Sequence, residues 1–315
     1  MMVDLVFIAF ALLLLFAGAE GLVRGSASLA LRAGLSRLMV GLTIVAFGTS
    51  SPELVVSIKA ALSQQGDIAV GNVVGSNTFN IAVILGLTAL VCPIPVHRQI
   101  IRLDAPIALG LTLLLALLLL DHALGRLEGA MLFMGLLAYT GLNVVLARRQ
   151  RTENAGAPDD SSDPPGSHHW GVDLAFIAGG VGVLVFGSHL LVEHSVSLAK
   201  GLGISEAVIG LTIVAAGTSM PELATSLVAA ARRQPDIAIG NIVGSNVFNI
   251  LGILGIASIV SPIGAPGISP VDYLTMILFT LLIIPLLYTG RVLHRLEGVL
   301  LLALYGVYLA VLWPV

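Results

Sequence analysis

Residues 41–54 read GLTIVAFGTSSPEL, and residues 210–223 read GLTIVAAGTSMPEL. A second matching pair follows these segments, with GNVVGSNTFNI at 71–81 and GNIVGSNVFNI at 240–250. Both pairs are separated by 169 positions, and 31 residues are identical over the 46-residue region that contains them. The same offset, without a gap, aligns charged and aromatic residues outside this region. The chain therefore consists of two copies of one structural unit.

The composition is that of an integral membrane protein. Of the 315 residues, 57% are hydrophobic and only 10% are charged, whereas a soluble domain carries about 25% charged residues. The apolar segments are continuous runs, such as LTLLLALLLL at 111–120, which excludes the alternating pattern of a β-barrel. The single Cys92 excludes an internal disulfide, and a net charge of −3 gives no reason to expect nucleic acid as a partner.

Apolar runs between Gly, Pro and charged residues predict ten transmembrane helices in an all-α fold, five in each copy of the repeat. The predicted helices lie at 3–30, 37–62, 67–91, 103–121, 127–147, 171–199, 206–231, 237–260, 271–290 and 295–313. The two repeats are 1–147 and 171–315, joined by a solvated linker, 148–170, whose Pro, Gly, Ser and Asp content cannot support a core. No Lys or Arg precedes the first apolar run, so we interpret it as a helix and not as a signal peptide.

The distribution of Lys and Arg predicts that the second repeat is inverted. With the N-terminus outside, 12 of these residues fall in cytoplasmic segments and three fall outside, as the positive-inside rule requires. An odd number of helices per repeat gives the two copies opposite orientations, and Arg232 and Arg233 stand where the first copy has Ser63 and Gln64. Inverted repeats are typical of secondary transporters. Both termini should lie outside and the linker in the cytoplasm.

Two acidic residues lie in the middle of otherwise apolar helices. Glu53 and Glu222 occupy equivalent positions of the repeat, and an ionisable group at this depth is costly enough to indicate function. The alternative is a structural ion pair, but no Lys or Arg lies near the middle of any predicted helix. We therefore expect the counter-charge to be a transported cation.

A proline precedes each of these glutamates. Pro52 and Pro221 have no N–H group to donate to the carbonyls of Gly48 and Gly217, four residues earlier. We therefore expect each helix to break near the middle of the membrane and to leave carbonyl oxygens free. Irregular backbone at this depth is tolerated where it is buried in protein or lines a polar cavity.

The helix that follows each glutamate carries polar residues at every fourth position. Such spacing places them on one face of a helix, and they could contribute ligands or form interhelical hydrogen bonds. The stripe consists of Asn72, Ser76 and Asn80 in the first repeat, and of Asn241, Ser245 and Asn249 in the second.

Carboxylate, hydroxyl, amide and carbonyl oxygens, without His or Cys, select a hard cation. Calcium takes 6 to 8 oxygen ligands, and two bidentate glutamates with the carbonyls of Thr49 and Thr218 would supply six. Magnesium resists dehydration and fits such a cage less well. Sodium ions or protons could neutralise the same oxygens, and we expect no cofactor.

The segments GTSSPE and GTSMPE, followed by GNVVGSN and GNIVGSN, resemble the two alpha-repeats of the sodium/calcium exchanger family, prokaryotic type, within the cation/calcium antiporters. The resemblance implies an antiporter of calcium and sodium ions in a prokaryotic plasma membrane, with four central cation sites and with the first and sixth helices sliding across the core. The implied ligands are Thr49, Ser50, Glu53, Ser76, Asn80, Thr218, Ser219, Glu222, Ser245 and Asn249. Some prokaryotic relatives carry Asp at the position of Asn249, so this ligand is neutral here.

Three other functions compete with sodium/calcium exchange. Calcium/proton antiport is the closest alternative, because protons could neutralise the same carboxylates. A passive channel is less favoured, since inverted repeats with broken helices indicate alternating access. An intramembrane aspartyl-type protease would also use two carboxylates, but here both acids are Glu within duplicated Pro-Glu motifs. No protein partner is evident.

The loop that contains Arg232 and Arg233 provides a test of the topology. In a variant without Cys92, a cysteine introduced at Gln234 should react with an impermeant thiol reagent only from the cytoplasmic side, because the two arginines retain this loop there. Labelling of intact cells from outside would contradict the predicted orientation.

Overall fold

The computed structural model describes residues 2–154, 170–201, 215–288 and 290–312, most of them in helices. The first half contains α1 (Met2–Ala33), α2 (Arg37–Val40), η1 (Gly41–Val45), α3 (Ala46–Thr49), α4 (Ser51–Leu62), α5 (Gly66–Phe79), η2 (Asn80–Ile84), α6 (Leu85–Val91), η3 (Ile100–Asp104), α7 (Ala105–Leu118), η4 (Leu119–Asp121) and α8 (Arg126–Asn154). The second half contains α9 (Trp170–Gly201), α11 (Ala215–Thr218), α12 (Met220–Ala231), α13 (Pro235–Phe248), η6 (Asn249–Leu254), α14 (Gly255–Val260), α15 (Pro270–Tyr288) and α16 (Arg295–Leu312).

Seven helices of the described residues are long and apolar enough to cross a membrane, and the bent pair Arg37–Thr49 and Ser51–Leu62 adds an eighth span. These eight correspond to eight of the ten predicted segments. The other two, 206–231 and 295–313, include residues outside the described ranges. The chain is thus a multi-pass helical protein, and the count of ten stays a prediction.

The segment predicted as a linker begins later than expected. Helix α8 continues to Asn154, seven residues beyond its predicted end at 147. The sequence ARRQRTEN lacks Gly and Pro, so nothing in it stops the helix before the Gly and Pro residues that follow. The remainder of the predicted linker, 155–169, lies outside the described residues.

Two short antiparallel strand pairs connect the halves, and the helical pattern of the sequence did not predict them. Strand β1 (Ile94–Pro95) pairs with β4 (Val292–Leu293), and β2 (Ala123–Leu124) pairs with β3 (Ile263–Gly264). At the repeat offset of 169, β1 corresponds to β3 and β2 corresponds to β4. The two strand pairs are therefore equivalent, and each half contributes one strand to each pair. Reciprocal contacts of this kind arise when two similar units are related by a two-fold rotation.

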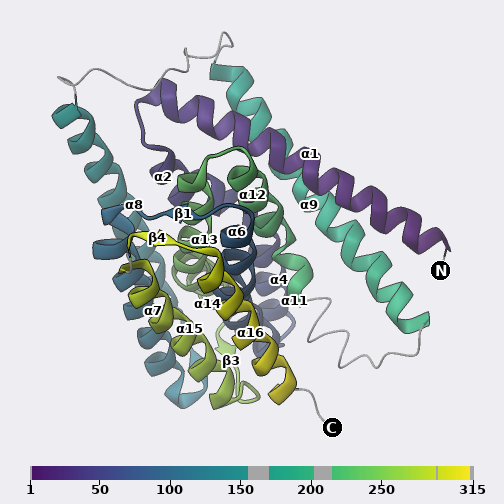
Figure 1. Cartoon of the computed structure of the whole chain (residues 1–315). Helices are drawn as coiled ribbons and strands as arrows, with labels where there is room; N and C mark the ends of the chain where they lie inside the picture. The colour runs from purple at the N-terminus through teal and green to yellow at the C-terminus, as the bar shows by residue number, and fades with distance from the viewer. Residues whose placement is uncertain (1, 155–169, 202–214, 289, 313–315) are drawn as a thin grey trace.

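Helices α1 and α9 pack along each other and lie diagonally across the side of the other helices (Figure 1). Small residues allow this approach: a Cβ atom on Gly180 would lie 2.6 Å from the backbone nitrogen of Leu22. Near one end, Arg32 pairs with Asp173 at 2.7 Å. Near the other, His194 lies 3.2 Å from Asp4. These contacts bind the two helices into one unit, here called the α1–α9 pair.

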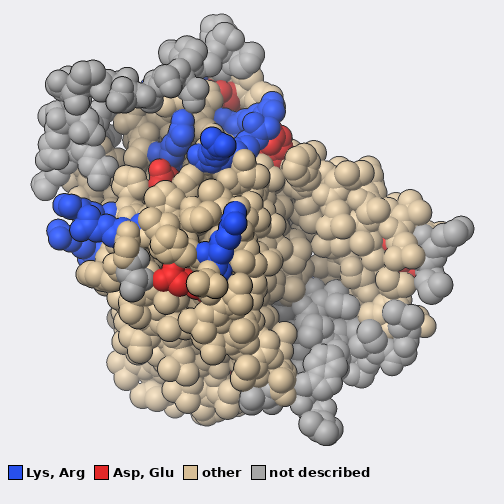
Figure 2. Space-filling model, viewed as in Figure 1, with Lys and Arg blue, Asp and Glu red and all other residues tan. Residues whose placement is uncertain are grey.

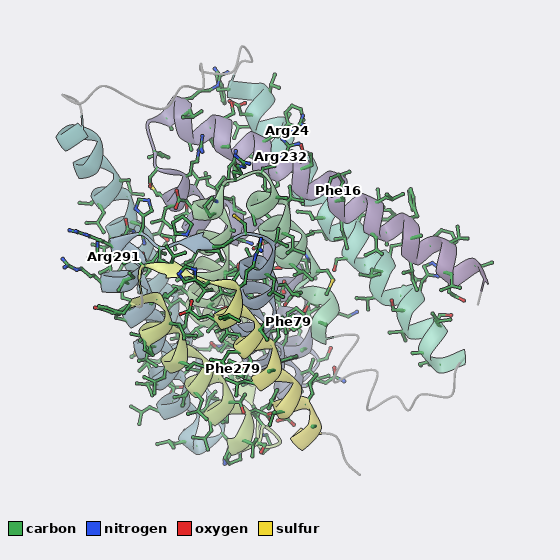
Figure 3. All side chains as sticks on the ribbon, viewed as in Figure 1. Phe16, Arg24, Phe79, Arg232, Phe279 and Arg291 are labelled. Atoms are coloured by element: carbon green, nitrogen blue, oxygen red, sulfur yellow. The ribbon has the colours of Figure 1, made fainter. Side chains whose placement is uncertain are left out.

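Charged side chains occupy a limited part of the surface. On the face shown in Figure 2, Lys and Arg lie toward the upper part of the molecule, and the lower part is uncharged. Apolar side chains cover much of the remainder. Phe16 on α1 is 61% exposed, whereas Phe79 and Phe279 are buried among the helices (Figure 3). An exposed apolar surface of this kind suits contact with lipid.

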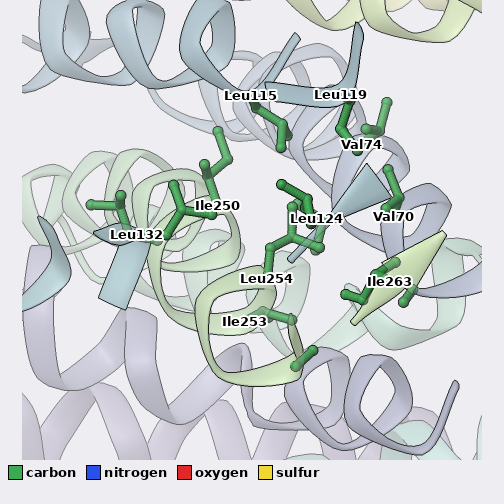
Figure 4. Packing of buried hydrophobic residues seen from close by; sticks show 14 of the residues in the cluster. Val70, Val74, Leu115, Leu119, Leu124, Leu132, Ile250, Ile253, Leu254 and Ile263 are labelled. Carbon is green, nitrogen blue, oxygen red and sulfur yellow. The ribbon is translucent and has the colours of Figure 1, made fainter. Parts of the chain in front are cut away.

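Apolar cores of the described residues lie between the two halves, and Figure 4 shows one of them. It combines residues of α5, α7 and α8 with residues of η6 and β3 (Figure 4). The residues labelled in the figure are Val70, Val74, Leu115, Leu119, Leu124, Leu132, Ile250, Ile253, Leu254 and Ile263. Neither half buries these side chains by itself, so the halves fold against each other.

Two adjacent glycines of α9 test the packing of the α1–α9 pair. Gly180→Ala should lower the unfolding temperature, since the added methyl group would overlap the backbone of α1, and such overpacking costs about 1–3 kcal/mol. Gly179→Ala is the matched control, because its Cβ would meet no described atom within 4 Å. Thermal unfolding in detergent compares the two, and equal unfolding temperatures would contradict the close approach.

Candidate cation site

Both proline-containing helices break one residue before the Ser-Pro-Glu or Met-Pro-Glu sequence. Ser50 separates α3 from α4 with φ −80° and ψ 8°, and Ser219 separates α11 from α12 with φ −86° and ψ 9°. In the first half the axis bends by 47° at this point. Both prolines lie in the first turn of the helix that follows, where no N–H is needed. The predicted helix breaks are confirmed.

One of the two carbonyls predicted to be free is occupied. The hydroxyl of Ser188, on α9, donates to the carbonyl of Gly217 at 2.6 Å. The prediction is therefore wrong for Gly217, because a neighbouring helix supplies the donor that Pro221 lacks. The repeat could not reveal this, since the position equivalent to Ser188 is Ala19.

The two intramembrane glutamates are fully buried and each contacts the opposite half. The Ser50 hydroxyl donates to Oε1 of Glu222 at 2.8 Å, and the Ser219 hydroxyl donates to Oε1 of Glu53 at 3.1 Å. Glu53 and Glu222 are 0% and 1% exposed. The breaks thus bring a serine of each half to the carboxylate of the other half. No Lys or Arg is among the buried side chains of the described residues.

Several oxygens at this site are buried without a hydrogen-bond partner among the described residues. They are Oε2 of Glu53, Oε2 of Glu222, Oδ1 of Asn80, Oδ1 of Asn249 and Oγ of Ser245. Buried polar atoms are normally paired, so these clustered oxygens are candidates to coordinate a bound cation. All five are acceptors that a hard cation could satisfy.

The asparagines at the start of each stripe are structural. The side-chain nitrogen of Asn72 donates to the backbone carbonyl of Glu53 and to Ser57 at 3.2 and 3.0 Å. Asn241 makes the equivalent bonds to Glu222 and Ser226. These bonds hold each glutamate-bearing helix against the next helix. For these two positions the interhelical hydrogen bonding considered above is the correct interpretation.

The threonines before each break link the halves through the same asparagines. The hydroxyl of Thr49 donates to Oδ1 of Asn241 at 3.0 Å, and that of Thr218 donates to Oδ1 of Asn72 at 3.4 Å. The hydroxyl oxygens of Ser76 and Ser219 lie 3.1 Å apart, and Ser76 can donate to Ser219, whose own proton goes to Glu53. All three predicted ligands therefore lie in the same buried network as the glutamates.

The asparagines at the end of each stripe have side-chain oxygens without a hydrogen-bond partner in the part of the chain that the structure describes. Nδ2 of Asn80 donates to Asn246, and Nδ2 of Asn249 donates to Asn77, both at 2.9 Å. Asn80 and Asn249 also begin the π-helical segments η2 and η6, and π turns in α-helices often mark functional sites. Each amide thus uses its nitrogen for structure and keeps its oxygen available.

Asn77 and Asn246 were not among the predicted site residues, although they orient two of them. Their side-chain nitrogens also donate to each other's backbone carbonyls at 3.2 and 3.3 Å. The duplicated Gly-Ser-Asn sequence was a signal for this pair, since each lies three residues before a stripe asparagine and shares its helix face. These residues position the site without a free oxygen of their own.

The ten predicted ligands therefore converge on one region, and all of them are buried. The site contains two acids, and the described residues hold no group of three or more His, Cys, Asp or Glu side chains suited to a metal. Five of these residues come from each half, and hydrogen bonds across the boundary connect the two sets. The arrangement suits the reversible binding of hard cations.

Comparison with known proteins identifies the group to which this architecture belongs. The family described as Sodium/calcium exchanger protein matches residues 3–145 and 172–313. The chain belongs to this family. The two matched stretches also correspond to the two halves of the sequence repeat.

Similar proteins are found in bacteria and archaea. The chain is 37% identical to CaxA of Alkalimonas amylolytica, which is named as an antiporter, with 97% and 98% of the two chains covered. It is 30% identical to the sodium/calcium exchanger MaX1 of Methanosarcina acetivorans, with 99% of both covered. A solved structure of the sodium-calcium exchanger NCX_Mj, soaked with sodium and calcium, superposes with a TM-score of 0.82 at 29% identity over 100% of both chains. The chain is thus a cation/calcium antiporter and not an enzyme.

Replacing either glutamate tests whether the free oxygens bind calcium. Glu53→Gln and Glu222→Gln remove one charge while they keep the shape and the serine contact. We expect saturating calcium to raise the unfolding temperature of the wild type, as a ligand at about 100 times its Kd stabilises by about 2.7 kcal/mol, and to have little effect on either variant.

Glu193→Gln is the control, because it makes the same chemical change at a side chain that is 64% exposed. It should retain the full calcium effect. A wild-type response in Glu53→Gln or Glu222→Gln would show that calcium binds elsewhere.

Proposed function

We propose that this chain exchanges calcium for sodium across the membrane, by alternating access to a site between Glu53 and Glu222. The observation that carries this proposal is the pair of fully buried carboxylates, each with an oxygen that has no partner among the described residues. Two carboxylates match the charge of one calcium ion, and the surrounding hydroxyl and amide oxygens belong to the ligand class that calcium prefers. The names of MaX1 and NCX_Mj support sodium as the counter-ion.

The ten buried side chains described above are the proposed ligands. The serine bonds between halves support this assignment, because they place oxygens of both halves around each carboxylate. Asn249 would act as a neutral ligand through its unpaired oxygen. A carboxylate at that position would lose the bond that its nitrogen donates to Asn77, so the amide suits the geometry.

The charges of the site favour obligatory exchange. Two carboxylates in a low-dielectric interior are penalised by desolvation when no cation is bound, so the empty carrier should reorient rarely. A carrier loaded with cations does not bear this cost and crosses between states. If three sodium ions replace one calcium ion, each cycle moves one net charge and responds to voltage by about 2.3 kcal/mol per 100 mV.

We propose ten transmembrane helices in two inverted five-helix repeats, with both termini outside and the linker in the cytoplasm. The two family matches and the reciprocal contacts across the halves support a duplicated architecture. The concentration of Lys and Arg toward one part of the surface in Figure 2 supports a cytoplasmic side there. Bacterial and archaeal relatives support a prokaryotic membrane.

The α1–α9 pair is the proposed moving unit. Alternating access requires one group of helices to move around a site held by the others. The ligands lie on helices other than α1 and α9, and the contacts within the pair bind those two helices to each other. Movement of the pair could therefore open the site alternately to each side while the ligands stay in place.

Calcium/proton exchange is the second candidate, because buried carboxylates accept protons and CaxA is named only as an antiporter. A channel or an intramembrane protease has less support, since the relatives are exchangers and antiporters. Peptide cleavage would favour the protease. Calcium flux that continues without any counter-ion would favour the channel.

Calcium-45 uptake into proteoliposomes distinguishes the two exchange reactions. We expect uptake to follow an outward sodium gradient at constant pH and to stop when choline replaces sodium, because sodium must bind for the carrier to return. Proteoliposomes that contain Glu222→Gln provide the background. Uptake driven by a proton gradient in sodium-free buffer would instead establish calcium/proton exchange.

A further inference from the structure

Polar contacts among the described residues tie the α1–α9 pair to the other helices, and two of them involve Glu20 and Ser188. On α1, the carboxylate of Glu20 pairs with the guanidinium of Arg232, which ends α12, and also with Arg24 on its own helix. Figure 3 shows Arg24 and Arg232 close together beside α1. On α9, Ser188 donates to the carbonyl of Gly217 at 2.6 Å. Each contact joins the proposed moving unit to a helix that carries the site.

The sequence repeat does not reproduce the ion pair. At the offset of 169, Glu20 corresponds to His189 and Arg232 corresponds to Ser63. Ser63 and Arg232 end their helices with nearly the same backbone conformation, φ −85° with ψ 8° and φ −85° with ψ 10°. The backbone is therefore equivalent at the two positions, and only the side chains differ.

The repeat does not reproduce the mid-helix contact either. Ser188 corresponds to Ala19, and Gly217 corresponds to Gly48. An alanine side chain has no donor, so the equivalent contact between α1 and α3 cannot form. In both cases the structure contains the ion pair or the hydrogen bond, and the equivalent positions of the repeat lack the residues that would form it.

Such asymmetry has an energetic consequence in a carrier of inverted repeats. The two halves exchange roles between the two facing states, so a contact with an equivalent in the other half is replaced when the carrier turns over. A contact without an equivalent is lost and stabilises one state only. This reasoning rests on the proposed function.

We propose that Glu20, Arg232 and Ser188 are positioning residues that form a one-sided latch and make the conformation described here the resting state of the carrier. The predicted orientation places Arg232 on the cytoplasmic side, so the latch holds that side closed in the resting carrier. Turning inward would break both contacts and bring His189 near Ser63 and Ala19 near Gly48.

The latch should shift the equilibrium between the two facing states only modestly, because the carrier must reach both states in every transport cycle. The side chains of Glu20 and Arg232 are 18% and 40% exposed, and a partly exposed ion pair shifts an equilibrium by up to about fivefold. A buried hydrogen bond such as that of Ser188 contributes a similar factor. Because the two contacts involve separate side chains, their effects should multiply to roughly 25-fold.

Thiol accessibility measures this bias directly. Ala229, on α12, is 0% exposed within an apolar cluster that α1 and α12 share. In a Cys92→Ser background, Ala229→Cys should react slowly with an impermeant maleimide applied to the cytoplasmic face of inside-out vesicles. Arg232→Gln and Ser188→Ala should each accelerate the reaction about fivefold, and the double variant about 25-fold.

Matched variants distinguish loss of the latch contacts from a general weakening of helix packing. Arg24→Gln also removes a guanidinium from Glu20, but one on the same helix, so it should leave the labelling rate unchanged. Arg232→Lys should restore most of the wild-type rate. Glu20→Gln should reproduce Arg232→Gln, and combining the two should add nothing further. Acceleration by Arg24→Gln equal to that of Arg232→Gln would overturn the latch.

Calcium uptake in the same vesicles distinguishes failure of the latch from failure of the proposed function. Wild-type labelling rates in Arg232→Gln, Glu20→Gln and Ser188→Ala, with sodium-driven uptake intact, would refute the latch alone. Accelerated labelling without sodium-driven uptake in the wild type would support the latch and refute sodium/calcium exchange.

Discussion

Glu53 and Glu222 are buried, and each accepts a hydrogen bond from a serine of the opposite half. No Lys or Arg is among the buried side chains of the described residues. Two carboxylates in this environment lose their hydration and repel each other, so they need protons or bound cations. The serine hydroxyls satisfy one oxygen of each acid, and the second oxygen has no hydrogen-bond partner among the described residues. The helix breaks, the asparagine network and the core between the halves all serve to hold this pair of acids in place.

Duplication produces this site only because the halves complete each other. Ser50 bonds to the glutamate of the second half, and Ser219 bonds to that of the first. Asn80 and Asn249 likewise donate to asparagines of the opposite half, and each short strand pairs with a strand of the opposite half. One repeat alone would contain a broken helix and a single buried acid, without the oxygens that surround it here. Hydrogen bonds between the repeats therefore offset the desolvation of the buried polar groups, and the site forms at the boundary between the repeats.

The departures from symmetry lie at the edge of this site and concern the α1–α9 pair. The proposed ligand side chains of the two halves differ little, whereas the contacts of Glu20 and Ser188 have no equivalents in the repeat. A carrier needs a similar site in both facing states, because the same ions must bind from either side. The energies of the two states need not be equal. The halves can therefore diverge at the contacts of the proposed moving unit without a change in the site itself.

The sequence by itself determined eight helical spans of the described residues, the two breaks, and Glu53 and Glu222 as the acids of the site. Apolar runs, proline and charge are local properties, so α1 and the helical spans Gly66–Val91 and Pro235–Val260 begin and end within a few residues of their predicted bounds. Only the tertiary structure decided which groups meet: that Ser50 contacts Glu222, that Asn72 bonds to the backbone of the preceding helix, and that Ser188 occupies the carbonyl of Gly217. Helical periodicity places a side chain on a face, but hydrogen bonding depends on which helix packs against that face, and this is set by the apolar core between the halves.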